Sequence, residues 1–467
     1  MRSQLRAEAG LLRGLLLFVC GVLLSTSVYA ARTAAPWAPL FAVVCAASCV
    51  ALTVTLSPRG WLSGSSVYAA MFFAFHCGVL LPLALGLPVP FFNEQDTQWA
   101  NGPAMLSAAG LVALGASTLL LSQVVFGWPR PVESAARERE PAHSCALGLV
   151  GMPVLTLGVL GWFAIVLSRG GAGLVFGGYG DFLAATRGSA TTYTYLCIGV
   201  GMAFVAGSSS TGTRRAALGL FSVWAAPAAL LGLRGEVLLP GLAYLVVLHR
   251  RQPVPFRPSY AALGLAALSL GSVIRVGRNV GVVGGRGWDW SAFNPIPGLV
   301  EMGYSIRPVV EVWRWNVYGY ESQVGFGTYV APVQRLVAGR LLGLPTPDAR
   351  VDPRNFSGVV ADRVGAIGGS PVAEAFRAHG AMGVVVVMLL IGLALVATDR
   401  LRGGARSDSC VGGVTYVLLL WVRNDFTPVP LNLLVIAALA VVTLAVSPVL
   451  TRARSGPGQH SVRVRAG

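Results

Sequence analysis

The sequence contains no lysine and few charged residues of any kind. Charged residues occupy 12% of its 467 positions, whereas a soluble domain carries roughly 25%. This shortage excludes an ordinary soluble globular protein. The seven cysteines show no CxxC or CxxH spacing, so the sequence supports neither a disulfide framework nor a zinc site. We expect no metal and no other cofactor.

Apolar residues make up 54% of the chain and gather in long runs. Most of these runs have about the length that a helix needs to cross a ~30 Å hydrocarbon layer. We therefore predict an all-α fold, a polytopic membrane bundle of about twelve transmembrane helices with a large helical loop outside the cytoplasm. The runs are 11–30, 36–56, 66–87, 104–126, 146–167, 192–208, 216–232, 237–249, 260–276, 381–397, 411–422 and 428–449.

All 35 basic residues are arginine, and they are distributed unevenly between the predicted loops. With the N-terminus in the cytoplasm every cytoplasmic loop is basic, and cytoplasmic loops of membrane proteins collect such residues. The net charge of +16 thus reflects topology, and we expect no nucleic-acid partner. We predict a multi-pass protein of the cell membrane with both termini cytoplasmic. The short outside loops hold only Arg32, Arg169, Arg187, Arg234 and Arg423.

This topology divides the chain into three parts. Residues 1–277 form an N-terminal bundle of about nine helices, residues 278–380 an extracytoplasmic segment, and residues 381–467 the last helices with a basic cytoplasmic tail. The first apolar run also has the parts of a cleavable signal peptide, so its removal stays open.

The extracytoplasmic segment contains two stretches with apolar residues at helical spacing. Each pattern predicts an amphipathic helix that lies on the membrane or caps the bundle. Ordered loops of this length usually carry function. The first stretch has Leu299, Met302, Ile306, Val310 and Trp313, and the second, within 329–342, has Val330, Val333, Val337 and Leu341.

Charged residues lie at three places where the membrane makes charge costly. The first is residues 232–236, which contain Arg234, and the second is Arg275 with Arg278. The third is residues 368–380, where Ser370 and Pro371 fit the cap and first residue of a helix. Gly369 and its neighbour should leave backbone N–H groups free at a positive helix end, which suits a phosphate.

Two of these segments resemble a known family. Residues 368–383, which end in His379-Gly380-Ala381-Met382-Gly383, are similar to the Gly-Gly-Ser-x-x-Ala-Glu segment of the O-antigen polymerase (Wzy) family. Residues 231–236 look like that family's Gly-x-Arg-Gly turn. Family members often have asparagine where this chain has His379. The long outside loop, which O-antigen ligases share, agrees with the resemblance.

The resemblance implies a metal-independent membrane glycosyltransferase that joins polyprenyl-pyrophosphate-linked oligosaccharide repeat units outside the cytoplasm. Its expected partners are the lipid-linked donor and acceptor, the bilayer, and flippase and chain-length regulator proteins. Arginine binds pyrophosphate through its planar fork, and a carboxylate or imidazole accepts the proton of an attacking hydroxyl. The candidates are Arg234, Arg275, Arg278, Arg377, Gly369 and Ser370 for substrate binding, and Glu374 and His379 for catalysis.

Other interpretations stay open at this point. The chain could be a lipid-linked oligosaccharide flippase or transporter, although ion-coupled transport usually needs carboxylates within the spans, and only Glu236 lies where one could be buried. A ligase that moves glycan to another acceptor is a further alternative. The charged residues could also be interfacial ion pairs or anchors.

Within the motif we expect Glu374 to matter more for activity than His379. The two residues are five positions apart, so they lie on different faces of a regular helix unless the helix breaks at Gly380.

The predicted topology can be tested by cysteine labelling. In a variant without native cysteines, Ser357→Cys should react with an impermeant reagent from outside the cell and Ser455→Cys only after the cytoplasmic side is opened. Labelling of Ser357→Cys only from the cytoplasmic side would overturn the orientation.

Overall fold

The computed structural model describes residues 2–89, 98–127, 141–278, 290–321, 323–365, 367–402 and 404–454. Every regular element in these ranges is a helix. The predicted all-α class is therefore confirmed. The long helices are α1 (Arg2–Thr33), α2 (Ala38–Leu56), α3 (Gly64–Cys77), α6 (Pro103–Phe126), α7 (Pro141–Gly170), α10 (Thr191–Ala206), α11 (Thr211–Leu230), α12 (Arg234–Arg251), α13 (Pro258–Arg278), α18 (Pro371–Arg400), α19 (Ala405–Arg423) and α20 (Val429–Arg454).

Shorter helices connect these long ones and build the segment between α13 and α18. The first group is η1 (Gly60–Leu62), α4 (Leu80–Ala84), α8 (Gly173–Phe176) and α9 (Tyr179–Thr186). The second group is η2 (Trp290–Ala292), α14 (Pro295–Met302), η3 (Gly303–Ile306), α15 (Arg307–Val317), α16 (Gly327–Gln334), η4 (Arg335–Leu341) and α17 (Phe356–Arg363).

Each predicted apolar run lies on one of the long helices, except that the run 66–87 is divided between α3 and the short helix α4. Only some of the long helices qualify as membrane spans. Among the described residues, 6 helices are long and apolar enough, namely α1, α2, α6, α7, α18 and α20. A 7th results if α9 and α10, bent by 104°, form one broken span. Of the remaining long helices, α3 fails because it has only 14 residues, and α12 fails because it carries charge at both ends. Twelve crossings thus stay a prediction.

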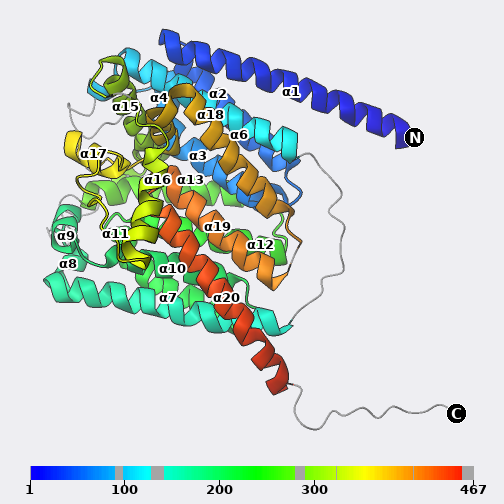
Figure 1. Cartoon of the computed structure of the whole chain (residues 1–467), viewed down its shortest axis with the longest axis vertical. Helices are drawn as coiled ribbons and strands as arrows, with labels where there is room; N and C mark the ends of the chain where they lie inside the picture. Colours follow the sequence, from blue (N-terminus) through cyan, green and yellow to red (C-terminus); the bar gives the residue numbers. More distant parts are fainter. Residues whose placement is uncertain are drawn as a thin grey trace.

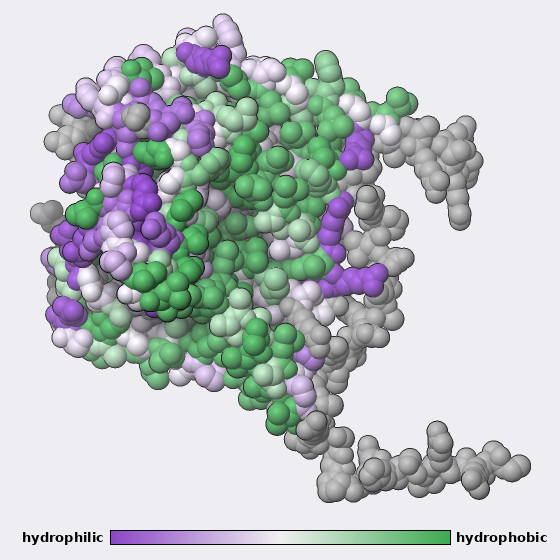
Figure 2. Space-filling model, in the orientation of Figure 1, coloured by the Kyte–Doolittle hydropathy of each residue, from purple (hydrophilic) through white to green (hydrophobic). Residues whose placement is uncertain are grey.

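The bundle is organised around α6. It is the most buried of the candidate spans and contacts α1, α2, α15 and α18. The short helices α8, α9, α15 and α17 lie at one end of the bundle, whereas α1 begins and α20 ends at the opposite end (Figure 1). Polar surface covers the end with α15 and α17, and a broad apolar surface covers the long helices beside it (Figure 2). This layering is typical of a protein that sits in a bilayer.

The first predicted amphipathic stretch is not one continuous helix. It is divided into α14, η3 and α15, and the backbone of η3 lies directly against the bundle. A Cβ atom at Gly303 would collide with the amide nitrogen of Val79, and one at Gly78 would collide with the carbonyl oxygen of Leu299. Two facing glycines therefore let the long segment dock directly on the bundle, and Ile306 is fully buried beside this contact.

We predict that Gly303→Ala lowers the thermal unfolding midpoint of the purified protein by several degrees. The added methyl group cannot fit without moving backbone on one side, and overpacking of this kind typically costs ~1–3 kcal/mol. The matched control is Gly219→Ala in α11, where a Cβ atom meets nothing within 4 Å. Equal midpoints for the two variants would contradict the docking contact.

Candidate active site

The first turn of α18 is capped by Ser370. Its hydroxyl oxygen accepts hydrogen bonds from the amides of Val372 (3.2 Å) and Ala373 (3.4 Å). The predicted N-cap and the start of the helix at Pro371 are thus confirmed. The Ser370 hydroxyl also lies 2.8 Å from Nε2 of the buried His76. His76 therefore has a structural partner and ties α3 to the start of α18.

Of the two amides expected to be free ahead of this helix, the one of Gly369 has a partner. The Gly369 N–H donates to the carbonyl oxygen of Arg423 at 3.0 Å, and a Cβ atom at Gly369 would press on the backbone of Asn424 and Asp425. Ser370 is fully buried. The tight contact between the α18 start and the α19–α20 turn is the physical reason for this correction. Phosphate binding by Gly369 and Ser370 stays a prediction.

Glu374 is buried in the first turn of α18, with 1% of its surface exposed. Its carboxylate accepts three hydrogen bonds, from the Thr328 hydroxyl (2.9 Å), the Trp421 indole (3.3 Å) and the Phe426 amide (2.8 Å). These donors belong to α16, α19 and the α19–α20 turn. Glu374 therefore holds three elements together, and no oxygen of its carboxylate is without a partner.

Arg377 is also fully buried, but it does not pair with Glu374. Its guanidinium forms a two-pronged ion pair with Glu321, at 2.6 and 3.1 Å. It also donates to the carbonyl oxygens of Pro353 (2.5 Å) and Arg354 (3.5 Å). Arg377 thus binds two distant parts of the long segment. A pyrophosphate contact would require some of these bonds to break.

The helix breaks at His379 and Gly380, which have non-helical backbone angles. Gly380 has φ 57° and ψ −148°, a conformation open to glycine alone. Because the chain turns sharply, a Cβ atom at Gly383 would collide with the carbonyl oxygen of Ala375. A break at Gly380 is the condition under which Glu374 and His379 could act on the same group, and the structure has this break.

The break frees backbone carbonyls, and the long segment satisfies them. Val324 donates its N–H to Arg377 O at 3.2 Å, and Gly325 donates to Ala378 O at 3.1 Å. The Phe326 ring lies 4.3 Å from the His379 ring, centroid to centroid. His379 remains partly exposed. It is thus the polar side chain at the corner of α18 that has access to solvent.

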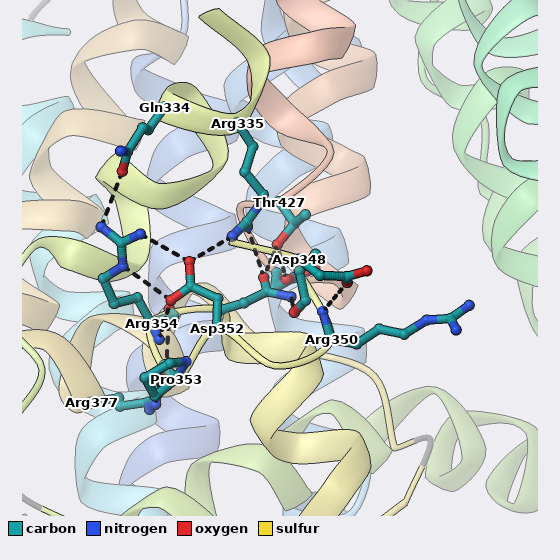
Figure 3. Close-up of polar contacts among 12 residues, drawn as sticks. Gln334, Arg335, Asp348, Arg350, Asp352, Pro353, Arg354, Arg377 and Thr427 are labelled. Carbon is teal, nitrogen blue, oxygen red and sulfur yellow. Dashed lines mark hydrogen bonds and ion pairs between the residues drawn. The ribbon is translucent and has the colours of Figure 1, made fainter. Parts of the chain in front are cut away.

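A second polar cluster lies beside Arg377 and centres on Asp352 (Figure 3). Arg335 and Arg354 both bond its carboxylate, at 2.9 and 3.0 Å. Burial opposes ionisation of Asp352, but the hydrogen bonds and charges of the two arginines outweigh it and hold the pKa of Asp352 below its ordinary value. Asn355 extends the cluster by accepting from Arg335 (3.3 Å) and Thr427 (2.8 Å). The long segment is thereby tied to the α19–α20 turn.

The predicted residues Arg234 and Arg275 both contact α14. Arg234, at the start of α12, forms an ion pair with Glu301 and is 22% exposed. Arg275 Nη1 lies 3.5 Å from Pro297 O. Arg278 ends α13, and its side chain lies outside the described residues. Arg234 and Arg275 thus lie at the same end of the α12–α13 pair, next to α14.

Arg423 joins the two segments that carry the family resemblance. Its guanidinium lies 3.7 Å from the Glu236 carboxylate, and Gly235 makes room for it, because a Cβ atom there would collide with Arg423 Nη1. The same residue accepts the Gly369 N–H through its carbonyl oxygen. The 232–236 turn and the start of α18 therefore meet at the end of α19.

Sequence reasoning missed Arg423, Glu321, Thr328 and Trp421 as parts of this site. Only Arg423 gave a signal, as one of the few arginines in the short outside loops. In the described part of the chain, no three His, Cys, Asp or Glu side chains come together as metal ligands.

Comparisons with known proteins give one partial similarity. Over 284 residues, 27% are identical to Protein CapE of Staphylococcus aureus, and the match covers 58% of this chain and 59% of that protein. This chain thus spans less than two thirds of that relative's length. No family model matches the sequence, and no solved structure matches.

We predict that Arg377→Ala lowers the thermal unfolding midpoint strongly, because it leaves the carboxylate of Glu321 buried without its main partner. Breaking a buried ion pair in this way costs about 3–5 kcal/mol. The double variant Arg377→Ala with Glu321→Ala should lose less than the sum of the single variants. Arg350→Ala, at an exposed position in the same segment, is the control. Additive losses would contradict the pairing.

Proposed function

We propose that this chain polymerises polyprenyl-pyrophosphate-linked oligosaccharide on the outer face of the cytoplasmic membrane. The partial similarity to Protein CapE supports a role in polysaccharide biosynthesis in general. The apolar helices support a membrane location. The step to polymerisation of repeat units is our own inference and rests on the site.

One observation carries this inference. The two segments that resemble the polymerase family lie more than 130 residues apart in the sequence, yet Arg423 contacts both of them. The two segments that carry the resemblance thus lie at one place in the fold. Arg234, Arg275 and Arg423 supply positive charge around it, which suits a pyrophosphate next to a low-dielectric layer.

The chemistry requires a leaving group and a proton acceptor. A sugar hydroxyl of one lipid-linked unit attacks the anomeric carbon of another, the bond from that carbon to the pyrophosphate oxygen breaks, and the polyprenyl pyrophosphate leaves with both electrons. The arginines stabilise its charge. His379 accepts the hydroxyl proton, because it is the partly exposed polar group at the corner of α18.

We assign Glu374 and Arg377 to positioning. Both are buried and hydrogen-bonded to several elements, so they fix the corner that carries His379. This assignment replaces our expectation from the sequence that Glu374 matters more than His379. Gly369, Ser370 and Arg278 remain candidates for contact with the pyrophosphate.

A ligase is the second candidate, because the same donor chemistry would serve a different acceptor. The ion pairs of the site do not distinguish the two acceptors. A flippase is less well supported, since the charged groups of this site lie near helix ends and in the segment between α13 and α18.

We predict that cells without this chain accumulate single lipid-linked repeat units, which glycan profiling of the lipid fraction would measure. Arg234→Ala and His379→Ala should each reproduce this accumulation, with rates reduced about 10²-fold or more. Arg234→Lys should recover only part, because a point charge does not replace the fork.

The control for these variants is Arg350→Ala, which should polymerise normally. All variants should be present in the membrane at equal amounts, as measured by immunoblotting. Loss of outward-facing units would indicate flipping instead. Normal polymer length with failed transfer to a final acceptor would indicate a ligase.

A further inference from the structure

The second amphipathic stretch leaves its apolar face uncovered. Helix α16 continues directly into η4, so residues 327–341 form one helical rod. Four apolar side chains along one side of it are largely exposed, namely Val330 (54%), Val333 (42%), Val337 (43%) and Leu341 (61%). Leu342 (64%) and Leu344 (53%) continue this apolar stripe beyond the rod.

Other side chains of the same rod hold it to the rest of the protein. Thr328 donates to Glu374, the Tyr329 ring lies 5.2 Å from the Phe426 ring, and Arg335 bonds Asp352. The rod therefore cannot rotate to bury the stripe without losing these contacts. Exposure of the stripe is a fixed property of the folded chain, and a contiguous exposed apolar surface marks a site of interaction.

The position of the rod in the fold indicates what kind of surroundings its apolar stripe meets. It lies across the ends of α18, α19 and α20 and not parallel to them (Figure 1). In the same view, apolar surface over the long helices meets the polar surface over α15 and α17 in this region (Figure 2). The rod thus lies where the broad apolar surface of the long helices ends.

An arginine–tyrosine contact lies at the end of the rod. The Arg340 guanidinium lies 5.9 Å from the centroid of the Tyr193 ring, and Tyr193, in the first turn of α10, is 46% exposed. Tyrosine and arginine are residues that concentrate where a membrane meets water. Their placement beside the stripe fits a rod that lies at the membrane surface.

We propose that the apolar stripe of α16 and η4 inserts into the acyl chains of the adjacent membrane leaflet, so that the rod lies in the membrane surface. Amphipathic helices bind membranes in this orientation, with the apolar face among the acyl chains. Because Thr328 and Tyr329 extend from the same rod to the site around Glu374, the depth of the rod sets the height of that site at the leaflet surface. The inference does not depend on the proposed enzymatic activity.

Spin labels on the rod test the insertion directly. In a variant without native cysteines, Val333→Cys, Val337→Cys and Gln334→Cys would each carry a nitroxide in nanodiscs of phosphatidylcholine and phosphatidylglycerol. Power saturation then compares access of oxygen, which concentrates among acyl chains, with access of a water-soluble nickel complex. Gln334 is the control, since it is exposed and accepts a hydrogen bond from Arg354 (3.2 Å) at the polar cluster.

We expect labels at Val333 and Val337 to favour oxygen over the nickel complex by several-fold, and the label at Gln334 to show the reverse. Nickel access at Val333 equal to that at Gln334 would place the stripe in water and overturn the proposal. Protection from both reagents would show a second copy of the chain on the stripe. A loss of oxygen access only after addition of undecaprenyl phosphate would show an isoprenoid chain as the occupant instead of bulk lipid.

Discussion

The arrangement of the site depends on the buried guanidinium of Arg377. A charge without solvent exposure is stable only when it is paired and its hydrogen bonds are made, and Glu321 with two backbone carbonyls meets that need. These partners come from the stretches on either side of α16. One buried charge on α18 therefore constrains where the α15–α16 connection and the turn before α17 lie.

The sharp bend of α18 at His379 and Gly380 depends on the same stretch of chain that carries Glu321. A helix that stops leaves carbonyl groups without partners, and here Val324 and Gly325 supply the missing donors from the same stretch that carries Glu321. The ion pair and the corner thus support each other. Glu374 adds a third connection, to the α19–α20 turn. Buried charge and broken helix together place a partly exposed imidazole at a fixed point.

The sequence predicts the helices well, because apolar runs and the cap at Ser370 are local signals. It predicts the membrane crossings less well. Hydropathy alone does not separate a spanning helix from a shorter one buried by neighbours, such as α3. The pairing of Arg377 with Glu321 could not be predicted, since 56 residues separate them and no local pattern links the two. The sequence showed only that the helix could break at Gly380, because glycine permits a positive φ without requiring it.

Arg234 and Arg377 show why residue type alone did not rank the candidate arginines. Both lie in segments that resemble the polymerase family, yet Arg377 is fully buried whereas Arg234 keeps 22% of its side chain exposed. A group that must meet a large charged substrate and release it cannot at the same time hold the fold together through four bonds. The proposed function therefore assigns the substrate to the partly exposed arginines at the ends of α12 and α19, and it assigns the buried Arg377 to the scaffold. Exposure, which only the fold determines, separates the two roles.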